Sequence, residues 1–251
     1  MTGHLIHLLR QGFPDRPAFD SAVSRALLEA AAAGAVSESL RLFVPGRVLA
    51  FGARDTAHPA YPEAAAAARQ EGFTPMERLA GGRATVFHEH TLAFAWAIPD
   101  PEPRRSIRAR FEQLAAVVVA ALAGLGVDAR VGEVPGEYCP GEHSVNAGGR
   151  RKLMGVGQRL VAGAAHVGGV VVVDRADLVN RVLLPVYRCL GYEWDPAATG
   201  SVAAEVPATV DTVAEALVAA LAARHEVVAA SLPPAVLDRA AALAAARPAP
   251  G

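Results

Sequence analysis

The stretch Thr91-Leu92-Ala93-Phe94-Ala95-Trp96-Ala97-Ile98 is the strongest fold signal in this chain. Bulky apolar residues alternate in it with threonine and alanine, so a β-strand here would carry one bulky face and one small face. A strand that is almost wholly apolar is typical of a sheet covered on both sides. We therefore predict that this stretch is a central strand of a buried sheet.

Further strands and helices are expected on both sides of this strand. Apolar runs predict strands at residues 4–9, 40–43, 48–51, 131–138, 142–147, 152–161 and 166–173. Pro45-Gly46 predicts a hairpin between the second and third of these strands, and residues 78–87 form a glycine-interrupted extended segment. Helical spacing and capping signals predict helices at residues 20–33, 62–70, 177–190, 210–224 and 233–246, and a long helix after Pro103.

Helices at both ends and local hairpins in the middle predict an α/β (α+β) fold, with a mixed, largely antiparallel central sheet flanked by helices. The 251 residues show no composition break, so we expect one domain, 1–251, with a helical C-terminal part at 175–246 and a flexible tail at 247–251. The chain has no Gly-x-Gly-x-x-Gly fingerprint and no phosphate-binding loop ending in Gly-Lys-Ser or Gly-Lys-Thr. A doubly wound nucleotide-binding fold therefore fits less well.

Composition excludes several classes of protein. With 52% apolar and 20% charged residues the chain is not disordered, and a formal net charge of -1 gives no bulk attraction to nucleic acid. The start of the sequence lacks a basic leader with an apolar core, and the longest apolar run is too short to span a bilayer. Two cysteines are too few for a disulfide framework. We expect a cytoplasmic protein with no membrane or nucleic-acid partner.

Two neighbouring motifs suggest an acyl-transfer site. Tyr138-Cys139-Pro140-Gly141 places a cysteine in a bend, and Gly149-Arg150-Arg151-Lys152-Leu153-Met154-Gly155-Val156-Gly157-Gln158-Arg159 places a lysine on a strand. A thiolate is a nucleophile, and a lysine beside it could bind a carbonyl oxygen, with Met154 expected on the same strand face. The alternatives are a half-buried cysteine without a role and an exposed strand lysine.

A glycine pair provides a third motif, Arg78-Leu79-Ala80-Gly81-Gly82-Arg83-Ala84. Paired glycines let the N–H groups of a loop face a carboxylate, a phosphate or an acyl carbonyl. The motif is weak by itself, because Gly-Gly turns are common, and gains weight from the segment that follows and from Cys139 downstream.

A metal site is the distant alternative. His88-Glu89-His90 would place two imidazoles on one strand face, and His58 or His143 could join them. A third ligand at a diagnostic spacing is missing, so no metal is expected.

Together the motifs resemble the catalytic domain shared by lipoate-protein ligases, octanoyltransferases and, more distantly, biotin-protein ligases. The resemblance covers roughly residues 40–174. It rests on the Arg78 to Ala84 motif, the strand at 91–98 and the Gly-basic-Lys-x-x-Gly-x-x-Gln pattern that ends at Gln158. Tyr138-Cys139-Pro140-Gly141 is most similar to the branch that moves an octanoyl group from the glycine cleavage H protein to other lipoyl domains.

This resemblance implies roles for the motif residues. Cys139 would form an acyl thioester, Lys152 would contact the acyl carbonyl, and N–H groups near Gly81-Gly82 or Gly155 would stabilise the oxyanion. The full substrate-binding set that it implies is Arg78, Gly81, Gly82, Arg83, Ala84, Gly155 and Gln158. Two departures stand out: the histidine that ligases carry after the glycines falls at Phe87, with His88 one residue late, and the hairpin tip at Ala147-Gly148-Gly149 is a residue long.

The resemblance also implies partners. Acyl transfer would use lipoyl-domain proteins, namely the H protein and the E2 subunits of 2-oxoacid dehydrogenases, or acyl carrier protein as the donor, and would need no cofactor. One alternative is an ATP- and Mg-dependent lipoate-protein ligase, which forms an acyl-adenylate and needs no thiol. The lack of the accessory domain that many ligases carry favours transfer. A further alternative is a non-catalytic protein that binds acyl groups or lipoyl domains.

Overall fold

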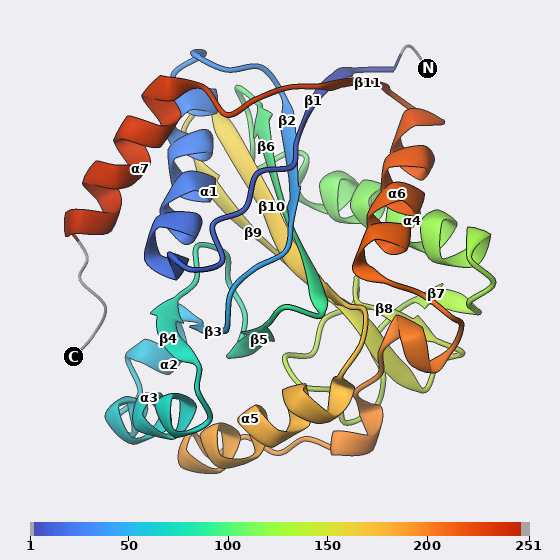
Figure 1. The fold of residues 1–251 in the computed structure, drawn as a ribbon. Coiled ribbons are helices and arrows are strands. Elements are labelled where there is room, and N and C mark those ends of the chain that lie inside the picture. The colour runs from blue at the N-terminus through green and yellow to red at the C-terminus, as the bar shows by residue number, and fades with distance from the viewer. Residues whose placement is uncertain (1–2, 247–251) are drawn as a thin grey trace.

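A computed structural model describes residues 3–246, and Figure 1 shows its elements in chain order. The main sheet has eight strands in the order β11-β1-β2-β6-β10-β9-β8-β7. Their bounds are Leu5–Leu9 for β1, Ser39–Phe43 for β2, Thr91–Pro99 for β6, Ala129–Val131 for β7, Val145–Ala147 for β8, Arg151–Val161 for β9, Ala164–Val172 for β10 and Glu226–Ala229 for β11. The stretch at 91–98 is thus a central strand, as predicted.

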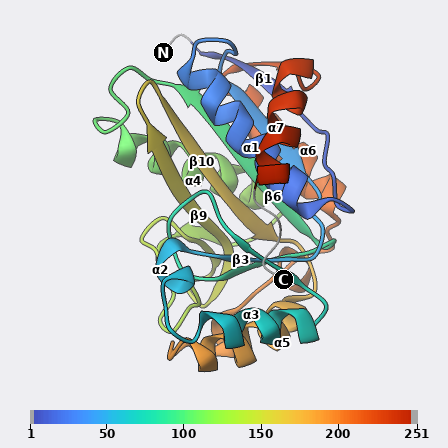
Figure 2. The same ribbon diagram turned by 90° about the vertical axis from the view of Figure 1, so that its left-hand side faces the viewer.

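The main sheet is mixed and largely antiparallel, as predicted. Only β1 pairs in parallel, with β2 on one side and β11 on the other, and every other neighbouring pair is antiparallel. A second sheet of three short strands, in the order β4-β3-β5, lies across one end of the first (Figure 2). Its strands are Val48–Phe51 for β3, Thr74–Glu77 for β4 and Thr85–Phe87 for β5.

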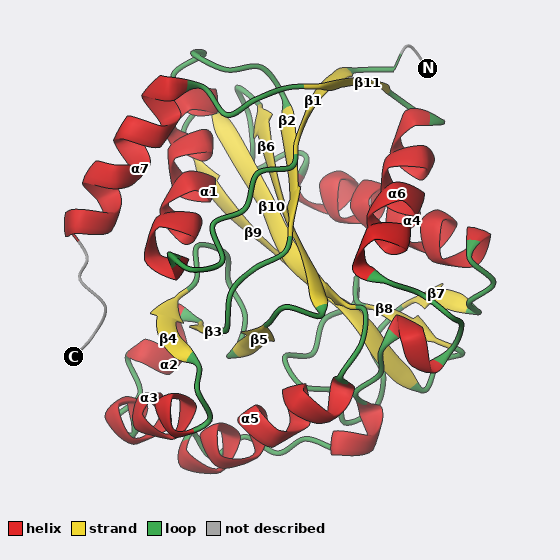
Figure 3. Cartoon of the chain, viewed as in Figure 1, coloured by secondary structure: helices red, strands yellow, loops and turns green. Residues whose placement is uncertain are grey.

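Helices cover both faces of the main sheet (Figure 3). Their bounds are Pro17–Ala32 for α1, Ala53–Thr56 for α2, Tyr61–Gln70 for α3, Ile107–Gly124 for α4, Ala176–Cys189 for α5, Val210–Ala222 for α6 and Pro234–Ala246 for α7. The bulky face of β6 packs with α4 and α6 in one core cluster, through Leu92, Phe94 and Trp96. Helices α1 and α7 pack together on the opposite side, and α3 and α5 cover the small sheet. No helix among residues 3–246 is long and apolar enough to cross a membrane.

The hairpin predicted at Pro45-Gly46 is wrong. Strand β2 pairs with β1 and β6 in the main sheet, whereas β3 pairs with β4 and β5 in the small sheet. The connection therefore carries the chain from one sheet to the other. Gly46 passes so close to the loop before α1 that an added Cβ would lie 2.1 Å from the carbonyl oxygen of Pro14. Contacts of this kind are tertiary and cannot be inferred from a turn dipeptide.

The strand predicted at 131–138 is also wrong, because β7 ends at Val131. Pro135 lacks an N–H for a sheet ladder, and Gly132 and Gly136 have φ values of 139° and 76°, which a regular strand does not allow. Residues 132–144 instead form a loop that carries Cys139. Only residues 85–87 of the extended segment at 78–87 form a strand, β5, and the sequence did not predict β4 or β11. The predicted flexible tail at 247–251 lies outside the described residues.

Candidate active site

One pocket of about 570 Å³ is lined by both sheets and by the first turns of α1. The small face of β6, with Ala93 and Ala95, forms part of its wall, and Phe94 of the bulky face both packs in the core and lines the pocket. Beside β6 the paired glycines Gly157 and Gly168 of β9 and β10 continue this wall without side chains. The wall is mostly apolar, which suits an alkyl chain.

Cys139 lies at this pocket in a left-handed backbone conformation with a φ of 43°. Its N–H donates a hydrogen bond of 3.1 Å to the hydroxyl oxygen of Tyr187, which in turn donates to the carbonyl oxygen of Ala84 at 2.9 Å. Burial raises the pKa of Tyr187 well above its ordinary value, so the phenol keeps the proton that it donates. A left-handed cysteine costs about 1–3 kcal/mol, and this hydrogen bond helps to hold it.

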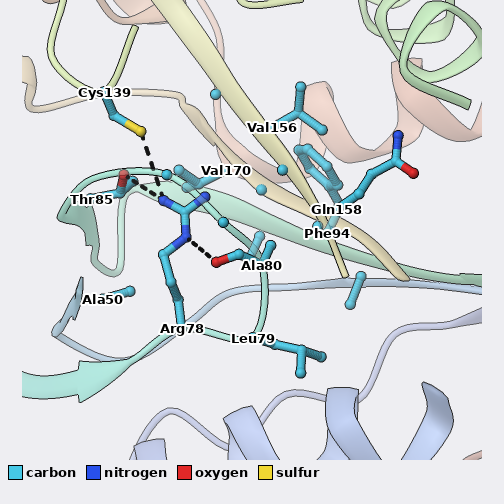
Figure 4. A pocket seen from close by; sticks show the side chains of 18 of the residues that line it. Ala50, Arg78, Leu79, Ala80, Thr85, Phe94, Cys139, Val156, Gln158 and Val170 are labelled. Atoms are coloured by element: carbon cyan, nitrogen blue, oxygen red, sulfur yellow. Dashed lines mark hydrogen bonds between the residues drawn. The ribbon is translucent and has the colours of Figure 1, made fainter. Parts of the chain in front are cut away.

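The sulfur atom of Cys139 faces the glycine-pair loop (Figure 4). The main-chain N–H of Arg83 donates to Sγ at 3.2 Å, and Nη1 of Arg78 lies 3.9 Å from it. Gly82 has a φ of 114°, and a Cβ there would lie 2.9 Å from Sγ, so glycine is required at this position. The N–H group nearest the sulfur thus belongs to Arg83, one residue after the glycine pair.

Arg78 fixes the shape of this loop. Its guanidinium donates to the carbonyl oxygens of Ala80 and Arg83, at 3.1 Å and 3.0 Å, and to Oγ1 of Thr85 at 3.2 Å. These bonds close the loop around one cation, whose charge lies beside the thiol. The side chain of Arg83 turns elsewhere, with its guanidinium 4.5 Å from the ring centroid of Tyr192.

Lys152 is almost completely buried, with 1% of its side chain exposed, so the alternative of an exposed strand lysine is wrong. Its ammonium donates to Oε1 of Glu137 at 2.8 Å and to the carbonyl oxygens of Tyr138 and Cys139 at 3.0 Å and 2.7 Å. The ammonium has three donors, and all three are used. Lys152 lines the pocket, whereas Met154 packs in the core, because β9 bulges between these two residues. The prediction that both share a face is wrong.

Glu137 is a residue of this site that the sequence did not reveal. Its side chain is fully buried and accepts hydrogen bonds from Lys152, from the hydroxyl of Ser144 at 2.6 Å, and from the N–H groups of Val134 at 2.9 Å and Gly141 at 3.2 Å. The one available signal was an acidic residue two positions before Cys139, which is common in exposed loops.

The other residues singled out in the sequence differ in how they lie relative to the pocket. Gly155 lies against Lys152, with a Cβ position 3.3 Å from the lysine Cε. Gln158 borders the pocket, but its side-chain amide bonds Nε of Arg110 and the carbonyl oxygen of Ile107, so it links β9 to α4. Phe87 lines the pocket, and His88, one residue later, is fully buried and is not among the lining residues.

The histidines proposed for a metal site have other contacts. Nδ1 of His88 accepts from the N–H of His90, Nδ1 of His58 accepts from the N–H of Ala60, and the ring of His143 stacks on Phe111. Within residues 3–246 no group of three or more His, Cys, Asp or Glu side chains is arranged to hold a metal ion.

Comparison with known proteins shows the family of this chain. The family model described as the lipoyl protein ligase A/B catalytic domain matches residues 16–222, so the chain belongs to this family. An octanoyl-[GcvH]:protein N-octanoyltransferase of Geobacillus kaustophilus is 33% identical over 174 residues, which is 66% of this chain and 61% of the relative. A protein of the same name from Bacillus velezensis is 28% identical over 66% of this chain and 60% of its own length. The alignments thus span about three fifths of these relatives.

The fold is that of known ligases. A bipartite lipoate protein ligase from Thermoplasma acidophilum, solved in a study that included its E2 lipoyl domain, superposes with a TM-score of 0.72 at 20% identity, covering 98% of this chain and 92% of the other. At that identity the likeness establishes the fold alone.

Proposed function

We propose that this chain is an acyltransferase that moves an octanoyl group, or a lipoyl group, from a carrier protein to the lysine of a lipoyl domain through a thioester on Cys139. The observation that carries the proposal is the thiol at an apolar pocket, with the N–H of Arg83 3.2 Å from its sulfur. The names of the two curated relatives, which act on octanoyl-GcvH, support the same reaction.

The reaction divides into two acyl exchanges. The Cys139 thiol gives up its proton as its sulfur attacks the carbonyl carbon of the octanoyl-lysine amide. A C–S bond forms, the C–N bond breaks, and the proton from the thiol passes to the leaving lysine amine. The amine of the acceptor lysine then attacks the thioester carbon, a new C–N bond forms, the C–S bond breaks, and the amine's proton passes to the departing thiolate. Neither half requires ATP, a metal ion or another cofactor.

Both exchanges pass through an oxyanion, and the donors nearest the sulfur are candidates to stabilise it. The N–H of Arg83 and the guanidinium of Arg78 lie 3.2 Å and 3.9 Å from Sγ, on the side of the glycine pair. Lys152 could donate to the acyl carbonyl only by exchanging one of its three present acceptors. The Gly81-Gly82 loop and the glycine wall of β9 and β10 would enclose the acyl chain.

We assign GcvH as the donor and lipoyl domains, such as those of E2 subunits, as acceptors. The relatives' names support GcvH, and the T. acidophilum ligase was studied with an E2 lipoyl domain. Neither relative's name includes acyl carrier protein, the other donor expected from the sequence. Both cysteines are free, and we propose a cytoplasmic location on that ground.

The test is intact-mass measurement after incubation with octanoylated GcvH, without ATP. We expect an octanoyl adduct that hydroxylamine removes, which Cys139→Ala lacks and Cys189→Ala retains. An adduct that persists in Cys139→Ala would contradict the thioester assignment. Full activity of Cys139→Ala together with a strict ATP requirement would instead identify a ligase, and binding of acylated GcvH without turnover would identify a binding protein.

A further inference from the structure

We propose that Glu137 is a positioning residue for acyl transfer, which holds Lys152 and, through it, the backbone of Cys139. The inference rests on the proposed function, and it concerns a residue that no sequence motif marks. Glu137 and Lys152 are both almost completely inaccessible to solvent, with side-chain exposures of 0% and 1%. An ion pair buried to this degree is costly to maintain, and it persists only when both partners are fully hydrogen-bonded.

The Glu137 carboxylate is fully hydrogen-bonded. Four donors converge on its carboxylate: the Lys152 ammonium, the Ser144 hydroxyl, and the N–H groups of Val134 and Gly141. The two N–H donors come from residues on either side of Glu137 in the same loop. The carboxylate is therefore the centre around which the loop at 132–144 folds, in a segment where the main chain forms no strand.

Lys152 passes this constraint on to Cys139. Besides Glu137, the ammonium bonds the carbonyl oxygens of Tyr138 and Cys139, so it holds the peptide groups on both sides of the Cys139 α-carbon. Tyr187 holds the Cys139 N–H from the opposite direction. These three contacts fix a φ of 43°, a value that cysteine rarely adopts, and this conformation aims the sulfur at the N–H of Arg83.

The arrangement explains why a carboxylate is needed and an amide would not suffice. Oε2 of Glu137 accepts from the N–H of Val134, while Oε1 accepts from Lys152, Ser144 and Gly141. In Glu137→Gln one of these positions becomes an NH2 group, which would face a donor instead of an acceptor. The lysine charge would also lose its only acidic partner among the contacts described for its ammonium.

We would test this with Glu137→Gln and, as the matched control, Glu133→Gln, which makes the same charge change at an exposed position of the same loop. The readout is the rate of Cys139 octanoylation by octanoyl-GcvH, separated into kcat and KM. We expect kcat to fall by about a hundredfold in Glu137→Gln, because the thiol is misplaced, while KM stays within about threefold, because the apolar pocket is intact. Glu133→Gln should match the unsubstituted protein.

A folded Glu137→Gln variant that acylates at the unsubstituted rate, or one in which only KM rises, would overturn the inference. If this variant does not fold, the unsubstituted protein decides: a crystal structure of its octanoyl thioester should keep Lys152 Nζ within hydrogen-bond distance of Glu137. An ammonium that has left Glu137 for the acyl group would overturn the inference as well. Failure of the unsubstituted protein to form any thioester would instead refute the proposed function.

Discussion

The hydroxyl of Tyr187 joins Cys139 to the loop that faces its sulfur. It accepts a hydrogen bond from the Cys139 N–H at 3.1 Å and donates one to the Ala84 carbonyl at 2.9 Å. Tyr187 lies on α5, far along the chain from both partners, and its side chain is fully buried. Cys139 and the glycine-pair loop are therefore both held by a third element, α5.

Removing this hydroxyl should weaken the site without opening a large cavity. In Tyr187→Phe the Cys139 N–H and the Ala84 carbonyl both lose their partner, which costs about 1–3 kcal/mol for a buried polar group. We expect a lower free energy of unfolding in urea and slower octanoylation of Cys139. Tyr61→Phe removes a hydroxyl from a residue that packs on the same core cluster and serves as the control. Equal octanoylation rates in the two variants would contradict the role assigned to Tyr187.

The two glycines of the predicted pair should differ sharply when each is replaced by alanine. Gly82 has a φ of 114°, and its Cβ would lie 2.9 Å from the Cys139 sulfur and about as close to Arg78, whereas a Cβ on Gly81 would meet nothing within 4 Å. We expect Gly82→Ala to be destabilised by about 1–3 kcal/mol and to lose most thioester formation, while Gly81→Ala keeps its melting temperature. Thermal unfolding and intact mass measure both effects, and a stable, active Gly82→Ala would refute the geometry.

The sequence predicted the parts of the fold that depend on local periodicity. The alternation at 91–98 identified both the central strand and the small face that now borders the pocket. The sequence did not predict β11. Glu226–Ala229 is a short, largely exposed strand, and it is extended because it pairs with β1. The separation of β2 from β3 was missed for the same reason, since it is decided by distant partners.

The site also combines residues that local motifs reveal with residues whose roles depend on the fold. Cys139, Lys152 and the glycine pair carry motifs and were predicted, but the burial of Lys152 and its three acceptors depend on how the loop at 132–144 folds back over β9. Glu137 and Tyr187 have no motif of their own. Tyr187 bonds residues far from it in the sequence, whereas Glu137 bonds donors of its own loop and Lys152 on β9, and both roles depend on how these segments fold together. The hydrogen bonds of such a network cannot be predicted until the positions of all its partner residues are known.

Acidification should destabilise the protein through two buried histidines before the paired carboxylates of Glu89 and Asp177 respond. Burial lowers the pKa of His88 and of His166 from the ordinary value of 6.5 to about 4. Well above pH 6.5 both are neutral whether the chain is folded or unfolded. As the pH falls from 6.5 toward 4 the unfolded chain takes up protons that the folded chain refuses, so stability is lost in this window.

The expected loss is on the order of 1.4 kcal/mol per pH unit for each histidine below its unfolded pKa. Glu89 and Asp177 also have lowered pKa values, about 2, because of their hydrogen bonds to Arg47 and Arg175, but they start from 4.5 and 3.8 and so act at lower pH. Urea unfolding at about pH 7.5, 6 and 5 measures how steeply the free energy of unfolding changes with pH. His166→Gln should have a shallower slope, and an unchanged slope would show that His166 is not buried in its neutral form.

The length of the acyl chain should set how well the donor is used, because most of the surface that lines the pocket is apolar. Each methylene buried there contributes about 0.8 kcal/mol, which corresponds to about fourfold in kcat/KM. Shortening the donor from octanoyl to hexanoyl removes two methylenes and should lower kcat/KM for Cys139 acylation by about fifteenfold. Val170, which faces the pocket, offers a matched variant: Val170→Ala enlarges the cavity and should reduce octanoyl and hexanoyl transfer alike. If hexanoyl and octanoyl donors react equally fast, the chain does not lie in this pocket, and the acyl group must be held elsewhere while Cys139 reacts.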